Sequence, residues 1–313
     1  MGSATAGVNH IDLAALAAAG IAFSDAAGCN ARPVAEHVIT CLYAHAAGLQ
    51  RAPQELTVGI IGCGHVGRSL AQLLDALGIQ HVDHDPPRAA MERGFHSALR
   101  ELALACEVVT LHVPLISDGP WPTVNLLNDQ LIAALRPGTL IINAARGGVL
   151  DETALSARLL APDALIAAID CWAGEPRVDS HLLKRTWLAT PHLAGHSREA
   201  RLAATRMLWE AVRRWRGLAP IPAPVVLPSV DTPLHYPTHG GTVALLKSLY
   251  PIADHHARMG ASLNMTAAQA AEHFDDIRRR YALRREFGAY SVACAGLAPD
   301  TVAELLALGF HCI

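Results

Sequence analysis

The sequence predicts an α/β fold, in which a doubly wound parallel sheet is accompanied by two smaller parts. Six short, nearly all-apolar runs alternate with helical patterns from Leu56 onwards, which is typical of parallel strands buried on both faces. A glycine-rich turn follows the first run and opens a helix. The length of 313 residues and a hydrophobic share of 51% fit a globular chain of two domains with a small third.

The elements follow in order. Segment 1–50 reads as loop, helix, loop, helix, with helical apolar spacing in His10–Gly20 and a longer helix over Ala31–Leu49 that Pro33 opens. Segment 51–190 holds the expected strands, which are "LTVGIIG", "IQHVDHD", "CEVVTLHVP", "GTLIINAA", "LIAAIDCW" and "TWLATPHL". Segment 191–220 carries a helix over about Ser197–Arg216. Segment 221–313 starts in the proline-rich linker Leu218–Pro233 and has two helical patterns and a strand near "GAYSVACAG".

Composition excludes some classes of function. A net charge of -3 without any basic run does not suit nucleic-acid binding. No apolar run reaches the length of a bilayer span and no leader is visible, so we expect a cytoplasmic protein without a membrane partner. Seven cysteines without a C-x-x-C pair favour a reducing compartment over a disulfide framework, with Cys41, Cys106 and Cys171 free and buried. His255 and His256 lack metal-ligand spacing, so we expect surface histidines and no metal.

The glycine-rich turn indicates a dinucleotide site. The G-x-G-x-x-G pattern stands at Gly62, Gly64 and Gly67, between an apolar strand and a helix, and Asp85 ends the next strand. The first glycine allows a tight turn, the second lets the backbone approach a pyrophosphate, and the third permits close helix packing. An aspartate at that place accepts bonds from ribose hydroxyls and repels a 2′-phosphate, which favours NAD over NADP. The nearby Arg88 leaves NADP open.

Three ionisable residues follow three of the expected strands. They are Arg146, Glu175 and His192, and the carboxyl ends of parallel strands share one edge of a sheet, where ligands bind. Singly they could be a surface cap, a turn residue before Pro176 and a satisfied core histidine. Together behind a nucleotide turn they suit hydride transfer: the histidine as base, the carboxylate fixing its tautomer, and the arginine holding a substrate carboxylate or the reacting oxygen.

The order of these motifs resembles that of the D-2-hydroxyacid dehydrogenases. That family carries the glycine fingerprint, "IN-x-x-RG", "D-x-x-x-x-EP" and a late "H-x-x-G", which stand here at Asn143–Gly147, Asp170–Pro176 and His192–Gly195. The resemblance implies a Rossmann-type NAD domain and catalytic roles for Arg146, Glu175 and His192. It implies an NAD site lined by Gly62, Gly64, His65, Val66, Gly67, Asp85, Val113, Ala144, Ala145, Asp170 and Gly195. Thr5 and His196 would contact the substrate, although relatives often have a tyrosine where His196 stands.

Within the family, the resemblance is greatest to members that act on a phosphorylated 2-hydroxy acid and form homodimers through an extra C-terminal α+β segment, here 221–313. A phosphate needs a second cationic site, for which Arg284 and Arg285 are candidates if dimerisation brings them near a cleft, with a solvated helix face as the alternative. Segment 1–50 would be the remnant of the substrate-binding lobe, to which helix 191–220 returns. Because the family has further residues before this loop, we expect Met1 to be a misassigned start.

Two rival interpretations stay open at this point. One is another D-2-hydroxyacid dehydrogenase acting on phosphoglycerate, glycerate or a lactate-like acid, against which the C-terminal segment counts. The other is a non-catalytic NAD-binding corepressor on the same fold. The complete set of arginine, glutamate and histidine disfavours that second interpretation.

Overall fold

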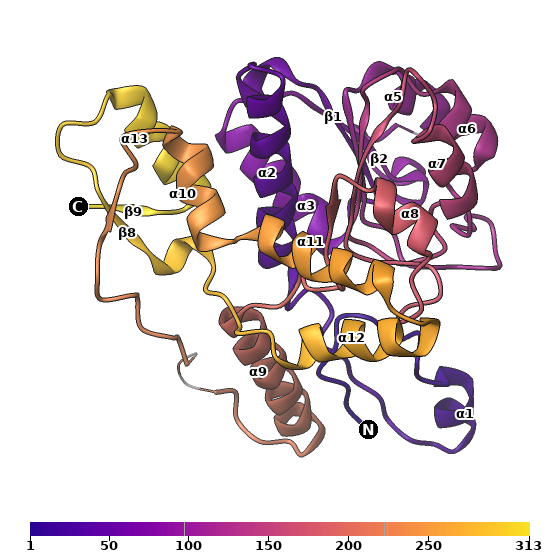
Figure 1. Cartoon of the computed structure of the whole chain (residues 1–313). Coiled ribbons are helices and arrows are strands. Elements are labelled where there is room, and N and C mark those ends of the chain that lie inside the picture. The colour runs from indigo at the N-terminus through magenta and orange to yellow at the C-terminus, as the bar shows by residue number, and fades with distance from the viewer. Residues whose placement is uncertain (97, 222, 224) are drawn as a thin grey trace.

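The computed structural model describes residues 1–96, 98–221, 223 and 225–313, and the predicted parallel sheet lies at its centre (Figure 1). Its six strands run in the order β2-β1-β3-β4-β5-β6 and every neighbouring pair is parallel. The bounds are β1 Val58–Ile61, β2 His81–His84, β3 Val108–Leu111, β4 Leu140–Asn143, β5 Ile166–Ile169 and β6 Leu188–Ala189. The expected α/β class is therefore confirmed, with each strand inside the apolar run that predicted it.

Helices cover both faces of this sheet, as Figure 1 shows. On one side lie α2 (Ala31–Gly48) and α3 (His65–Ala76), and on the other lie α5 (Leu99–Ala105), α6 (Asp129–Ala134) and α7 (Glu152–Arg158). Two short helices lie in connections between strands: α4 (Pro86–Ala89) follows β2, and α8 (Ser180–Arg185) lies between β5 and β6. Strand side chains alternate between two apolar cores: Ile60 and Ile142 belong to one, Ile61 and Ile141 to the other. Burial on both faces explains why these strands are apolar throughout.

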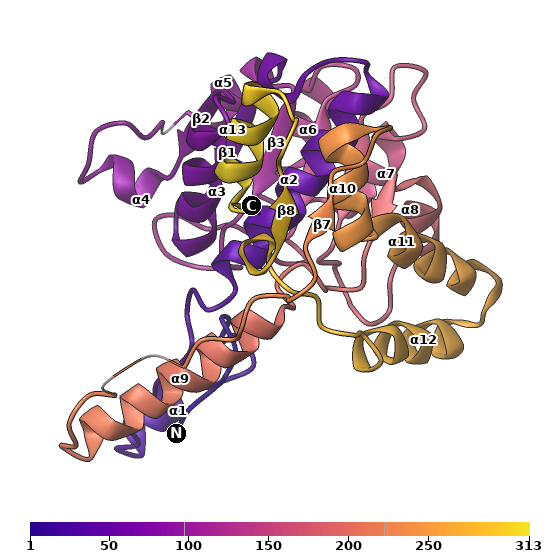
Figure 2. The ribbon, with the colours of Figure 1, turned by 90° about the vertical axis from the view of Figure 1, so that its left-hand side faces the viewer.

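The N-terminal segment and one long helix extend away from the rest of the molecule (Figure 2). This arm contains α1 (Leu13–Ala18) and α9 (Arg198–Trp215). Outside the arm, the short 3₁₀ helix η1 (Pro53–Glu55) connects α2 to β1. Ser197 caps α9 by accepting a hydrogen bond from Ala200 N–H. Both helices lie where their apolar spacing predicted them.

The C-terminal segment forms a small unit of helices and short strands, in which helices separate parallel strands. Its three-stranded parallel sheet has the order β7-β8-β9. Its elements are β7 (Leu234–His235), α10 (Gly241–Leu249), α11 (Ile252–Ala261), η2 (Ser262–Asn264), α12 (Ala267–Arg279), η3 (Phe287–Ala289), β8 (Ser291–Ala293), α13 (Pro299–Leu308) and β9 (His311–Cys312). Leu245, Phe287 and Phe310 share one apolar core with Leu74 of α3, so this unit packs directly on the nucleotide-type fold. The expected linker precedes it, and Pro222 and Pro224 of that linker lie outside the described residues.

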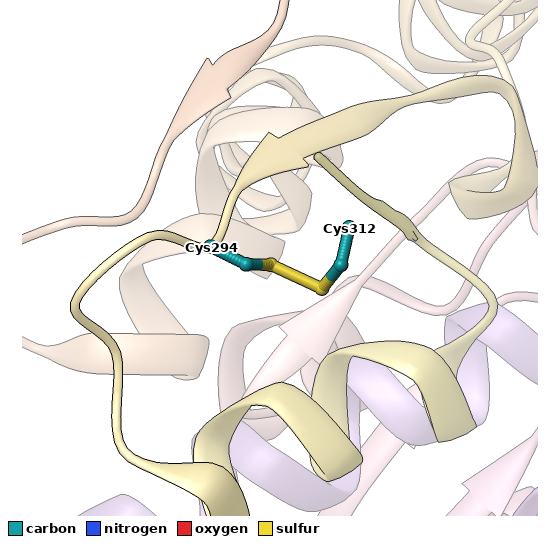
Figure 3. Close-up of a disulfide and its surroundings, with 2 residues drawn as sticks. All are labelled: Cys294 and Cys312. Atoms are coloured by element: carbon teal, nitrogen blue, oxygen red, sulfur yellow. A yellow bond between two sulfur atoms is a disulfide. The ribbon is translucent and has the colours of Figure 1, made fainter.

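Two expectations about side chains were wrong. Cys294, directly after β8, forms a disulfide with Cys312 of β9 (Figure 3), because these strands pair side by side and the two Cα atoms lie 5.4 Å apart. Cys41, Cys106 and Cys171 are free and buried, as expected. His255 is buried among aromatic rings and is not a surface histidine. Within the described ranges, no helix is long and apolar enough to cross a bilayer.

Candidate active site

The structure brings two of the three predicted catalytic side chains into direct contact. His192 Nδ1 lies 2.6 Å from Glu175 Oε1, and the Trp172 N–H donates to the second carboxylate oxygen of Glu175 at 3.1 Å. An ionised carboxylate only accepts, so Nδ1 carries the proton that it donates. The other ring nitrogen, Nε2, is then the atom that can exchange a proton with a substrate.

A buried carboxylate holds the loop that carries His192. Asp170 accepts hydrogen bonds from Thr190 Oγ1 at 2.6 Å, Leu193 N–H at 2.6 Å and Ala194 N–H at 3.1 Å. The His192 N–H donates to the Asp170 carbonyl at 2.8 Å, and the residue has a positive φ of 56°. Asp170 therefore fixes an uncommon backbone conformation at the residue that would do the proton chemistry.

The pKa of His192 is raised above its ordinary value. The charge that the Cys171 sulfur carries when it is ionised contributes most, ahead of the hydrogen bonds to Cys171 and Glu175 and the charge of Asp170, while burial opposes them. Burial also raises the pKa of the Cys171 thiol, so that thiol is neutral at neutral pH. The two carboxylates are then the charges that remain, and they stabilise the imidazolium form that His192 takes on accepting a proton.

Arg146 keeps its charge available. Its guanidinium donates to the Ala145 carbonyl at 2.6 Å and to Asn9 Oδ1 at 3.3 Å. The guanidinium also packs closely on the backbone of Gly7, since a Cβ added to Gly7 would lie 1.7 Å from Nη2. Across the described part of the chain it has no carboxylate partner. Thr5 lies in the same loop as Gly7, and its Oγ1 donates to the Gly7 carbonyl at 2.8 Å. An unneutralised guanidinium bound only to neutral acceptors is suited to an anionic ligand.

The glycine-rich turn has the shape that a dinucleotide pyrophosphate needs. Gly62 has a φ of +93°, and an added Cβ would lie 2.7 Å from Val113 Cγ1. A Cβ on Gly67 would lie 2.1 Å from the Gly62 carbonyl oxygen, whereas one on Gly64 would meet nothing within 4 Å. Gly64 is the N-cap of α3 and offers no side-chain cap, which leaves N–H groups free at the positive end of the helix dipole. Gly62 and Gly67 thus allow the tight turn and the close packing of the helix, and Gly64 leaves space for the pyrophosphate. The residues present therefore fit NAD.

Asp85 follows β2 next to this turn. Its carboxylate accepts from Cys63 N–H at 2.9 Å and from Arg88 N–H at 3.1 Å, and each oxygen retains a lone pair for a ribose hydroxyl. Arg88 is itself engaged, since it donates to Glu92 and to the Cys63 carbonyl. An arginine bound in this way is less available for a 2′-phosphate, which favours NAD.

The other predicted cofactor and substrate residues surround these groups. Val66 packs on the buried Ala144, which with Ala145 forms the turn after β4. Gly195 lies against the Asn30 side chain and the His65 ring against Gly28, so both predicted contacts face the segment that precedes α2. The centroid of the His196 ring lies 6.3 Å from that of Tyr281. These placements are compatible with the predicted roles, which stay predictions.

Within the single chain, Arg284 and Arg285 do not form a free phosphate site, and the alternative of a solvated helix face was wrong. Helix α12 ends at Arg279, before both residues. Arg284 is buried and donates to Glu36 at 2.6 Å and to the Pro33 carbonyl at 2.8 Å, while Arg285 pairs with Glu199. Their charges are neutralised by ion pairs inside the fold, because the segment after α12 runs between α2, which carries Glu36, and α9, which carries Glu199.

Sequence reasoning missed several supporting residues. The Trp172 indole donates to the Thr190 carbonyl at 2.9 Å, which ties the Glu175 turn to the His192 loop. Glu152 accepts from Ala173 N–H at 2.6 Å, and burial raises its pKa to about 7. The "DCW" that ends the fifth apolar run was a usable signal, since a buried indole needs an acceptor. In the sequence, Glu152 has the features of an ordinary residue in the first turn of a helix, so no sequence signal pointed to it.

Comparison with known proteins agrees with this site. Residues 35–194 match the family described as "D-isomer specific 2-hydroxyacid dehydrogenase, NAD binding domain". The chain is 37% identical over 319 residues to erythronate-4-phosphate dehydrogenase of Hahella chejuensis, covering 99% of this chain and 83% of the relative. It is 38% identical over 318 residues to the enzyme of the same name from Escherichia coli O81, covering 100% of this chain and 82% of the relative.

Solved structures show the same fold at lower identity. D-lactate dehydrogenase from Aquifex aeolicus, complexed with NAD and lactic acid, superimposes with a TM-score of 0.58 at 22% identity, over 69% of this chain and 75% of the other. A glyoxylate/hydroxypyruvate reductase from Sinorhizobium meliloti gives 0.58 at 24% identity, over 70% and 76% of the two chains.

Proposed function

Because the chain belongs to the D-isomer specific 2-hydroxyacid dehydrogenase family, we propose that it oxidises 4-phospho-D-erythronate to 2-oxo-3-hydroxy-4-phosphobutanoate with NAD. The class of activity, an NAD-dependent 2-hydroxyacid dehydrogenase, comes with the family. The substrate is that of its curated relatives, named erythronate-4-phosphate dehydrogenase, and places the reaction in pyridoxal 5′-phosphate biosynthesis.

The proposed chemistry uses the residues of the candidate site as follows. When bound, NAD accepts the hydride that leaves the hydroxyl-bearing carbon. His192 Nε2 takes the hydroxyl proton, and Glu175 at 2.6 Å holds the ring in the tautomer that this requires. Arg146 binds the substrate carboxylate with its guanidinium and orients the reacting carbon. In the reverse direction the imidazolium returns the proton to the carbonyl oxygen.

The contact between His192 and Glu175 is the single observation that carries this proposal. A histidine paired to a carboxylate at the exit of neighbouring parallel strands, with an unneutralised arginine on the next strand, is an arrangement for moving a proton beside an anionic substrate. A merely structural histidine needs neither the free arginine nor the open glycine turn on the same edge of the sheet.

Reduction of NAD in the presence of 4-phospho-D-erythronate tests the proposal. We expect turnover with this acid and much weaker turnover with phosphoglycerate, glycerate and D-lactate. Preference for one of those acids would assign a different substrate. NAD binding without turnover of any acid would favour a corepressor and reject the enzyme.

We also propose a homodimer in the cytoplasm, on the likeness of the C-terminal unit to dimerisation segments of the family. Light scattering of the purified chain measures its mass in solution. A monomer at enzyme concentrations used for assay would reject the dimer, and cell fractionation tests the compartment.

A further inference from the structure

Two buried polar groups near the end of α12 have few or no partners in the protein. The Nε of Arg278 is buried and makes no hydrogen bond within the described ranges, and the buried hydroxyl of Tyr281 has only the Arg284 backbone beside it. The Arg278 guanidinium also joins no ion pair within those ranges, although its neighbours Arg280, Arg284 and Arg285 each do. Buried polar groups almost always have partners, so an unpaired arginine nitrogen three residues from a sparsely paired hydroxyl points to a ligand that the chain alone does not supply.

This place adjoins the candidate active site. The Tyr281 ring lies 6.3 Å from that of His196, and the Tyr281 N–H donates to the Arg278 carbonyl at 3.4 Å. His196 follows His192 in the same loop, where its N–H donates to the Leu193 carbonyl at 2.9 Å. The C-terminal unit therefore reaches the loop that carries His192 through Tyr281, which follows α12, and Figure 1 shows α12 crossing this end of the molecule.

Charged groups of both signs act on the His196 ring. Burial lowers the pKa of His196 most, the charge of Asp170 opposes it, and the charges of Arg278, His192 and Arg201 lower it further. His196 is thus a neutral hydrogen-bonding ring near two cations. The Asp170 carboxylate accepts three hydrogen bonds from the loop that carries His192, so its oxygens are occupied by that loop.

We propose that Arg278, assisted by the Tyr281 hydroxyl, binds the terminal phosphate of the substrate. This assignment rests on the proposed function. In 4-phospho-D-erythronate the phosphate and the carboxylate stand at opposite ends of a four-carbon chain, with the reacting carbon next to the carboxylate. Arg146 then holds one end and Arg278 the other, and both use the fork of donors that suits planar or tetrahedral oxyanions. Arg278 is a specificity residue that does not touch the reacting atoms.

The variant Arg278→Gln removes the charge and keeps most of the side-chain volume. We expect kcat/KM for 4-phospho-D-erythronate to fall by roughly 10–100-fold, as for loss of a hydrogen bond to a charged group, while kcat/KM for D-erythronate stays unchanged. Arg278→Lys should recover part of the loss, and Tyr281→Phe should lose a smaller factor for the phosphorylated acid only. Arg279→Gln is the matched control, since this exposed neighbour on the same helix loses the same charge and should change neither value.

A binding measurement separates this inference from the proposed function. Calorimetry of the NAD-loaded protein with inorganic phosphate should show binding that Arg278→Gln weakens and Arg279→Gln does not. Such binding without turnover of 4-phospho-D-erythronate would leave the anion site standing and reject the proposed substrate. Turnover with equal losses for both acids in Arg278→Gln, or phosphate binding that ignores this substitution, would overturn the role of Arg278.

Discussion

The substitution Glu175→Gln isolates the charge beside His192. An amide oxygen can still accept from Nδ1, so the ring keeps its tautomer while the negative charge is lost. Opposite charges about 4 Å apart interact by about 4 kcal/mol at an effective dielectric constant of 20, and one pKa unit corresponds to about 1.36 kcal/mol. The side chains of His192 and Glu175 are 29% and 25% exposed, so solvent weakens this only partly. We expect the pKa of His192 to fall by about 1–3 units.

The assay is the pH dependence of kcat/KM for oxidation at saturating NAD. Oxidation needs neutral His192 as the base, so the rate rises with pH and levels off above the pKa of that residue. In Glu175→Gln the midpoint should move to lower pH by the same 1–3 units as the pKa. The plateau should fall by about 10²-fold, because the imidazolium that forms in the transition state loses its counter-charge.

Glu101→Gln supplies the control for this experiment. Glu101 is an exposed residue of α5, and the same chemical change there should leave both midpoint and plateau in place. A midpoint that stays fixed in Glu175→Gln, or moves to higher pH, would refute the coupling between the two side chains.

Three further changes test other parts of the site. Arg146→Lys should lower kcat/KM by about 10²–10³-fold, because a point charge cannot make the two-pronged contact with a carboxylate, and near-normal turnover would contradict the assigned role. Gly62→Ala should lower the free energy of unfolding by about 1–3 kcal/mol in urea and weaken NAD binding, since its positive φ is combined with a clash. Gly78→Ala, with a positive φ but open space, should cost less stability and leave NAD binding unchanged; equal effects would remove the clash from the explanation. Glu152 has a folded pKa of about 7 against 4.5 unfolded, so the stability that its proton gives is complete below 4.5 and is lost as pH rises towards 7. Glu152→Gln should therefore flatten the stability profile between these pH values by about 2–3 kcal/mol relative to the parent chain, and parallel profiles would contradict the raised pKa.

Local patterns predicted the sheet and the site because the information lies within a few residues of each element. Each strand is a short apolar run between turn residues, and the parallel arrangement then places the ends of β4, β5 and β6 on one edge. The pairing of Glu175 with His192 follows from that edge and from the chemistry that a histidine base requires. No precise contact was needed for either inference.

Contacts between distant segments were not predictable in the same way. Arg284 meets Glu36 across 248 positions, and nothing in the sequence around either residue selects the other. The disulfide depends on the pairing of β8 with β9, two very short strands whose register the apolar pattern does not define. Both errors concern the C-terminal unit, where elements are short and burial is set by packing on α2 and α3.

The ion pairs of the C-terminal arginines show why the sequence alone suggested Arg284 and Arg285 as phosphate ligands. Arg284 and Arg285 form the more conspicuous pair, but Glu36 and Glu199 neutralise them, and breaking a buried pair such as Arg284–Glu36 costs about 3–5 kcal/mol. These two pairs tie the chain after α12 to α2 and to the first turn of α9, next to the His192 loop. The anchoring holds the end of α12 in place, and with it Arg278. A charge that serves an incoming anion must stay unpaired in the fold, and Arg278 meets this condition in the described part of the chain, whereas Arg284 and Arg285 do not.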